Sequence, residues 1–385
     1  MKIRQVISLV LILAFAMLST SAIAASKQKL DASKWKIKDI YEHLSVNGDK
    51  MPPEEAKAYA QFIVDCQEPK TGNFVDSYGE FVYSLKAYHL VKRFGLEPKY
   101  PLSVCEPTYR YEINEEVSET MSVEGFRKWL DHIYKNYSAY SAGSLRGHFM
   151  EPHVFNLRKA GKPLESSPYI PVLRKWLLDN QKENGFWTRP DDSDFNGWNG
   201  MMKMSGGVGK ANIDLPHPDK MIKTILKYQD TELGTFTSAG GCTNHNALHV
   251  ARQCSTNNDM IMWQEIFRAM QRHAGYVQRR FDPETGLFRS PPGYDLPPDP
   301  ATTRMTGSEV GNIIGYCRAL LSDENAGLIA VKNQKLTAGQ KPITREEIVD
   351  VMVQATGLAE LAKKSYSEYI QAEHEKKYGK AAEKK

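Results

Sequence analysis

Five short segments of this chain concentrate side chains that could bind a polar ligand or move a proton. Four of the ten histidines fall within just two of these segments. An imidazole with a pKa near neutrality is suited to accept a proton at working pH. In chain order the segments hold Asp76, Tyr78 and Glu80; Arg146, His148, Glu151 and His153; Asn196, Trp198, Asn199 and Lys203; Asn244, His245, Asn246 and His249; and Arg304, Ser308, Glu309 and Asn312.

Two kinds of sugar chemistry would use these side chains. Proton abstraction and β-elimination on an acidic sugar needs a neutraliser for the carboxylate, a base for the C5 proton and an acid for the leaving oxygen. Hydrolysis would instead use two carboxylates, and Glu151 and Glu309 form the best pair. For elimination the neutraliser would be Arg146, Asn199 or Asn246, the base His148, His153 or His245, and the acid Tyr78.

Further residues are expected to hold the substrate. Lys203 and Asn312 are polar binding candidates, and Trp198 and Tyr294 offer aromatic surfaces on which a sugar could stack. Trp198 fits a core position equally well. The polar stretch 190–199 and the proline-rich stretch 290–300 are read as walls of the site, and a surface strap is the alternative for the second.

One spacing is compatible with a metal. Cys242-x-x-His245-x-x-x-His249 would put three zinc-type ligands on one helix face. Because no fourth ligand is evident, we expect no metal or other cofactor, and a small cysteine beside hydrogen-bonded histidines is the simpler interpretation. The five cysteines are too few for a disulfide framework in a chain this long, so free thiols are expected.

The elements that must position these residues are repeats about 50 residues long. The clearest copy reads Trp176-Leu177-x-x-x-Gln181-x-x-x-Gly185-Phe186-Trp187, an apolar pair followed by Gln and Gly-x-aromatic. A fixed period of this size indicates a repeat architecture. Other copies are centred on Gln67, on Gln229, on Phe281 in place of Gln, and, most loosely, on Tyr134 with Gly143.

Each copy predicts a helix, a turn and a second helix. Val172, Leu173, Trp176 and Leu177 have helical spacing, and Gly185 would end that helix because glycine tolerates the left-handed conformation. The Gln amide would bond free backbone groups at the turn. A helical hairpin cannot bury its apolar face alone, so we expect the hairpins to stack.

The motif resembles the QW-type repeat of terpenoid cyclases and protein prenyltransferases, over roughly residues 55–330. The resemblance implies an all-α fold, an incomplete α/α toroid of five or six helical hairpins. Several polysaccharide lyase and glycosidase families share this architecture. The Asp-rich acid motif of the squalene-type cyclases is missing, and Asp191-Asp192-x-Asp194 is its nearest counterpart. The resemblance therefore implies the toroid and not a terpene substrate.

The N-terminus predicts export. A short basic start, an apolar run over residues 6–18 and small residues near Ala24 are typical of a secretory signal peptide. We therefore divide the chain into a signal peptide (1–24), an N-terminal extension (25–54), a toroid domain (55–365) and a Lys-rich tail (366–385). A periplasmic or secreted monomer is expected, with no membrane attachment after cleavage. The net charge of +4 comes largely from the two termini, which gives no support for nucleic acid as a partner.

These observations favour a carbohydrate-active protein with a poly- or oligosaccharide ligand. The leading hypothesis is a polysaccharide lyase acting on an acidic glycan at the mouth of the toroid. The alternatives are a glycoside hydrolase with two carboxylates, a non-catalytic glycan-binding or scaffold protein, and a terpenoid cyclase-like enzyme.

Overall fold

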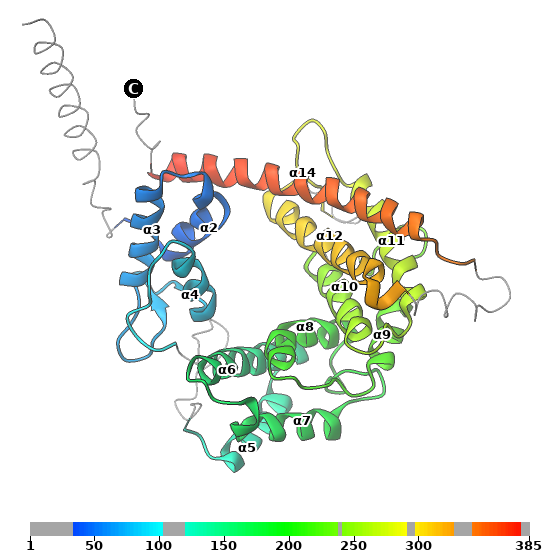
Figure 1. Cartoon of the computed structure of the whole chain (residues 1–385), viewed down its shortest axis with the longest axis horizontal. Coiled ribbons are helices and arrows are strands. Elements are labelled where there is room, and N and C mark those ends of the chain that lie inside the picture. The colour runs from blue at the N-terminus through cyan, green and yellow to red at the C-terminus, as the bar shows by residue number, and fades with distance from the viewer. Residues whose placement is uncertain (1–33, 103–119, 238–240, 291–296, 327–340, 379–385) are drawn as a thin grey trace, which may run out of the picture. The chain divides into compact units, whose positions relative to one another are not determined.

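The computed structural model describes residues 34–102, 120–237, 241–290, 297–326 and 341–378. Helices dominate these residues, which confirms the all-α prediction (Figure 1). The strands found there are β1 (Phe74–Val75) and β2 (Phe81–Val82), which form one short antiparallel hairpin. The predicted signal peptide, Cys105 and Tyr294 lie outside the described residues. The chain forms two compact units, residues 1–102 and 103–385.

The smaller unit is built around the first copy of the repeat. Helix α3 (Pro53–Asp65) precedes the turn, the β1–β2 hairpin follows it, and α4 (Ser84–Arg93) completes the copy. Helix α2 (Ile37–Asn47) and the short helix η1 (Gly48–Lys50) pack against α3. Asp76 fixes the start of α2, because its carboxylate accepts the backbone N–H of Ile37 at 2.8 Å.

The larger unit alternates between two layers of helices. The outer layer contains α5 (Val123–Asn136), α7 (Tyr169–Asn180), α9 (Pro218–Lys227) and α11 (Trp263–Arg279). The inner layer contains α6 (Ala139–Lys159), α8 (Asp194–Lys210), α10 (Gly241–Thr256) and α12 (Pro300–Leu321), which pack in that order along the concave side of this unit (Figure 1). The short helix η2 (Leu164–Ser166) lies between α6 and α7 in the chain. Helix α14 (Arg345–Tyr378) packs along α12.

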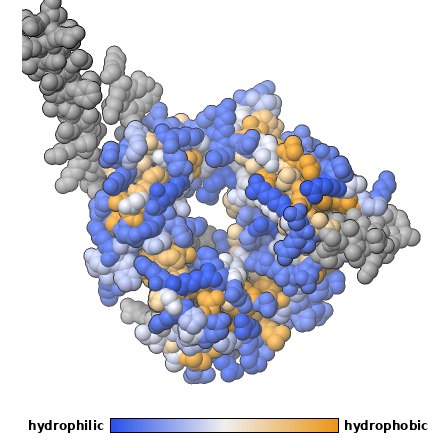
Figure 2. All heavy atoms as spheres, viewed as in Figure 1, coloured by the Kyte–Doolittle hydropathy of each residue, from blue (hydrophilic) through white to orange (hydrophobic). Residues whose placement is uncertain are grey.

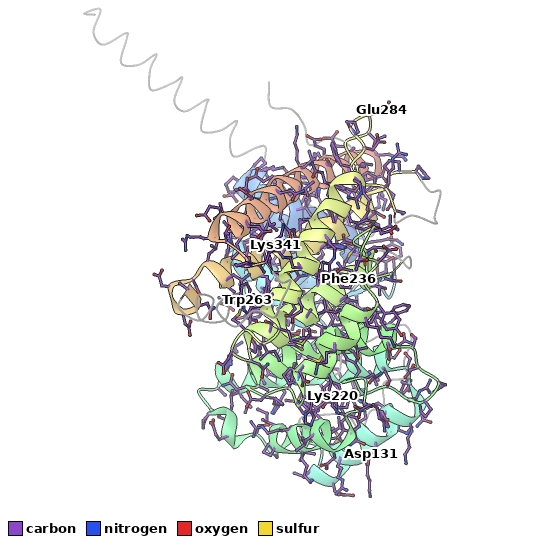
Figure 3. The ribbon with its side chains drawn as sticks, turned by 90° about the vertical axis from the view of Figure 1, so that its right-hand side faces the viewer. Asp131, Lys220, Phe236, Trp263, Glu284 and Lys341 are labelled. Carbon is purple, nitrogen blue, oxygen red and sulfur yellow. The ribbon has the colours of Figure 1, made fainter. Side chains whose placement is uncertain are left out.

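The hydrophobic core of the larger unit lies between these layers. Phe126, Trp176, Phe267 and Tyr316 are buried members of one continuous apolar cluster. Figure 3 looks onto the outer layer, where Asp131 on α5, Lys220 on α9 and Trp263 on α11 lie at successive levels. Figure 2 shows hydrophilic residues over much of the visible face. Each hairpin therefore buries its apolar faces against its neighbours, as stacked repeats must.

The predicted role of the Gln residues is confirmed at three turns. The Gln181 amide donates to the carbonyl of Gly185 at 2.8 Å and to that of Pro216 at 2.6 Å. Gln67 donates in the same way to Gly72 and Tyr100, and Gln229 to Gly234 and Ala269. In each case one bond closes the turn and the other reaches a carbonyl 33, 35 or 40 residues further along the chain. Gly72, Gly185 and Gly234 all have positive φ, as the turn requires.

The second copy of the repeat differs from the prediction. Gly143 does not end a helix but lies within α6, where its backbone packs directly on α8. A Cβ at Gly143 would lie 2.1 Å from the carbonyl oxygen of Gly200. The two helices are therefore as close as their backbones allow, and Gly143 is required by that approach rather than by a turn.

The C-terminal prediction also changes in detail. Helix α14 continues to Tyr378, so residues 366–378, read as the start of a Lys-rich tail, are helical. Ile348, Val351, Ala355, Leu358 and Ala362 bury one face of this helix. None of the helices in the described ranges is both long and apolar enough to cross a membrane.

We expect Gln181→Leu to lower the free energy of unfolding by about 1–3 kcal/mol, because it leaves two carbonyls without their donor. Urea unfolding followed by circular dichroism measures this difference. The matched control is Gln61→Leu, because Gln61 is exposed and bonds only Asp65, one turn along its own helix. A Gln181 effect no larger than the Gln61 effect would contradict the proposed role of the amide.

Candidate functional site

The strongest candidate site lies on one face of α10. His245, His249 and Arg252 follow one another at helical spacing on this face. The Asn312 side chain of α12 donates to Nδ1 of His245 at 3.0 Å. On the other side, Nε2 of His249 lies 3.0 Å from the hydroxyl of Ser205 on α8. Three consecutive inner helices thus hold the two imidazoles in place.

The hydrogen bonds of Ser205 assign the tautomer of His249. The Ser205 hydroxyl donates its proton to the carbonyl of Met202 at 2.7 Å. Its oxygen must therefore accept from Nε2 of His249, which places the imidazole proton on Nε2. The lone pair of His249 is then on Nδ1, which is the basic nitrogen of this tautomer.

Both imidazoles are held in the neutral form. Burial, the charge of Arg252 and the neighbouring His245 together lower the pKa of His249 to about 4, against a contribution from Asn312. Burial also lowers the pKa of His245, while the Ser308 carbonyl and Glu309 oppose that change. A neutral imidazole is the form that can act as a general base.

Arg252 adds a positive charge that has no acidic partner among the described residues. Its Nε is buried without a hydrogen bond, and burial lowers the pKa of its guanidinium. The guanidinium lies over Gly315 of α12, where a Cβ would be only 2.8 Å from Nη1. Glycine at this position leaves the space that the guanidinium occupies.

A second positive charge lies on α8. Lys203 is exposed, its ammonium lies 5.3 Å from the ring centroid of Tyr140, and its charge contributes to the lowered pKa of His245. Beside it, the Asn246 amide of α10 donates to the Asn199 oxygen of α8 at 2.8 Å. The structure therefore brings together His245, Asn246, Asn199, Lys203 and Asn312 from the predicted set.

Three other predicted residues lie in the packing between layers instead. Trp198 is fully buried, with its ring against Phe195 and Tyr228, so it offers no surface to a sugar. Arg146 is buried and stacks on the Trp176 ring of the outer helix α7 at 4.4 Å. Burial lowers its pKa to about 9, and its Nε and Nη2 have no hydrogen bond.

His153 points to the outer layer too. It is buried, and its Nε2 lies 2.8 Å from the hydroxyl of Ser167, just before α7. The imidazole stacks on Phe149 and meets Tyr169 edge-on. We therefore assign His153 to the core, since the geometry gives it a structural partner and no open face.

The two carboxylates proposed for hydrolysis each have a cationic partner. Glu151 on α6 pairs with Lys210 on α8. Glu309 on α12 is fully buried and accepts from Arg280 at 3.1 Å. Their helices are separated in the inner layer by α8 and α10, which is a poor arrangement for attack on one glycosidic bond.

His273 completes the network around Glu309. Its Nδ1 lies 2.9 Å from the Gly234 carbonyl and its Nε2 lies 3.3 Å from Glu309. A carbonyl only accepts, so Nδ1 carries a proton, and the contact at Nε2 needs a second proton, held either by His273 or by Glu309. The network joins α11, α12 and the turn at Gly234.

The remaining predicted residues come from α6, from the smaller unit and from the first turn of α10. His148 is half-buried on α6, two inner helices before α10. Tyr78 is exposed on the β1–β2 turn of the smaller unit, and Lys36 lies 5.7 Å from its ring centroid. Cys242 is exposed at the start of α10. Within the described ranges, no three His, Cys, Asp or Glu side chains come together as a set that could hold a metal ion.

The sequence patterns did not identify Arg252, Ser205 or the space that Gly315 leaves for the guanidinium, which we call the Gly315 notch. The available signal was the i, i+4, i+7 spacing of His245, His249 and Arg252, which extends the histidine pair by one turn. Comparisons with protein-family models, with curated proteins and with solved structures find no match to this chain.

Proposed function

We propose that this chain is a polysaccharide lyase of the α/α toroid type, acting on an acidic glycan by proton abstraction and β-elimination. One observation carries the proposal. Neutral histidines on α10 share a face with cations on α8 and α10 that have no acidic partner among the described residues. His249 takes the C5 proton as the base, and a cation on this face neutralises the uronate carboxylate. The oxygen that leaves as the C4–O bond breaks takes its proton from water. Export to the periplasm or beyond, inferred from the N-terminal sequence, fits a glycan substrate.

The chemistry of the face suits this reaction. Removing the C5 proton of a uronate places negative charge on the adjacent carboxylate, so a cation at that group lowers the barrier. A neutral imidazole can take the proton. The approach of a carboxylate would also raise the pKa of His249 from its low value, since a nearby negative charge favours the imidazolium. The base would thus strengthen when the substrate binds.

The alternatives have less support. A hydrolase would need Glu151 and Glu309, and these carboxylates are engaged by Lys210, Arg280 and His273. Stacking of a sugar on Trp198 is excluded by its burial. A terpenoid substrate would call for an apolar surface, whereas His245, His249, Arg252 and Lys203 make this face polar and basic.

A panel of polysaccharides tests the proposal. Uronate-containing polymers incubated with the purified protein should develop the ultraviolet absorbance of a new C4–C5 double bond. Neutral glucans and a chemically carboxyl-reduced sample of each reactive polymer are the matched controls, because they cannot undergo this elimination in the same way. Release of reducing ends from neutral glycans without ultraviolet absorbance would establish hydrolysis and contradict the proposal.

A further inference from the structure

The guanidinium of Arg252 has no acidic partner in the part of the chain that the structure describes. Its Nε is buried without a hydrogen bond, and no carboxylate of the described residues forms an ion pair with it. Arg252 is half-buried, so its guanidinium loses part of its hydration without an ion pair to compensate for it. Arg280 in the same unit is paired with Glu309. Arg146 also has no ion pair among the described residues, but its guanidinium packs on the Trp176 ring at 4.4 Å, and Arg252 has no such ring contact there.

The surroundings of Arg252 hold it in one place. The guanidinium fits over Gly315 of α12, and any side chain there would displace it by contact with Nη1 at 2.8 Å. The next residue, Gln253, reaches toward α8, with its Nε2 3.5 Å from where a Cβ of Gly209 would be. Arg252 is therefore placed against α12, and its neighbour Gln253 against α8.

We propose that Arg252, beside His249 and over the Gly315 notch, is a binding site for the oxyanion of an acidic sugar, and that this oxyanion is a carboxylate. The guanidinium is planar and presents two parallel N–H donors that match a carboxylate, which makes a bidentate pair favourable. Lys203 on α8 adds a second positive charge to the same face. The inference rests on the proposed function for the sugar that bears the charge, but binding does not require the elimination reaction.

Ligand-observed NMR titration of the purified full-length chain tests the site, with D-glucuronate, D-glucose 6-sulfate and D-glucose as probes. Glucuronate should bind about tenfold more tightly than glucose, because only glucuronate offers a partner for the guanidinium. Glucose 6-sulfate separates the two sources of an oxyanion, and we expect it to bind more weakly than glucuronate. Tighter binding of the sulfate would overturn the carboxylate assignment.

Three variants locate the site. Arg252→Gln removes the charge, and Gly315→Ala keeps the charge but displaces the guanidinium, so each should weaken glucuronate binding by about tenfold or more. Gly311→Ala is the matched control, since it lies one turn earlier on α12 with nothing within 4 Å of its Cβ position, and its affinity should be unchanged. Melting curves confirm that each variant is folded.

The results separate this inference from the proposed function. Equal affinity for glucuronate and glucose, or an unchanged affinity in either Arg252→Gln or Gly315→Ala, would overturn the oxyanion site. Glucuronate binding that depends on Arg252, together with no elimination on any uronate polymer, would leave the site in place and reject the lyase.

Discussion

Replacing His249 with alanine should lower kcat/KM for elimination by about a hundredfold or more, which is the usual contribution of a general base. The variant removes the imidazole whose Nδ1 lone pair is fixed by the bond from Nε2 to Ser205. The rate of ultraviolet absorbance increase on a uronate polymer measures the effect. His132→Ala is the control, because His132 is exposed on the outer helix α5 and should leave the rate unchanged.

The pH profile distinguishes a base from a structural histidine. Because the pKa of His249 in the free protein is about 4, the base is neutral at pH 7 and becomes protonated only as the pH falls toward 4. The acid limb of kcat/KM, which reports the free enzyme, should therefore lie well below the usual histidine value of about 6.5. An acid limb at or above that value, or the same limb in His249→Ala, would rule out His249 as the base.

The second large effect is on stability. Glu309→Ala should lower the free energy of unfolding by about 3–5 kcal/mol, because it leaves the buried Arg280 without its counter-charge and His273 without its Nε2 partner. Urea unfolding monitored by circular dichroism gives the value. Glu284→Ala is the matched control, since Glu284 is exposed on a turn (Figure 3) and should change stability by less than about 0.5 kcal/mol.

The same pair of variants tests the assignment of Glu309 against hydrolysis. If Glu309 were a hydrolytic acid or base, its replacement would abolish release of reducing ends while the protein stayed close to normal stability. A loss of stability below about 1 kcal/mol would mean that the network around Arg280 is not a packing device, and would restore Glu309 as a candidate for chemistry.

The helical repeat could be predicted from local signals alone. Gln67, Gln181 and Gln229 each stand a few residues before a glycine, and the turn depends on that short spacing. Gly143 was misread because a glycine is needed both where φ is positive and where two backbones approach closely. Gly200, which Gly143 approaches, is far along the chain, so no residue near Gly143 indicates the contact.

The candidate site was harder to predict because helical spacing does not say which face meets which layer. Trp198 and His153 are buried toward the outer helices, while Asn199 and His249 face other inner helices, although all four lie on inner helices. An error of about 100° in helix orientation exchanges these roles. The spacing from His245 and His249 places Arg252 on the same helix face, but the space for its guanidinium depends on the absence of a Cβ at Gly315 of another helix.

The Gln bonds also have a consequence for synthesis on the ribosome. The second acceptors of Gln67, Gln181 and Gln229 lie 33, 35 and 40 residues further along the chain. When a hairpin has just been synthesised, the second acceptor of its Gln amide has not yet been translated. At about 5–20 residues per second, the ribosome needs several seconds to reach that acceptor. Each of these turns therefore acquires its second hydrogen bond only after a further 33, 35 or 40 residues are present.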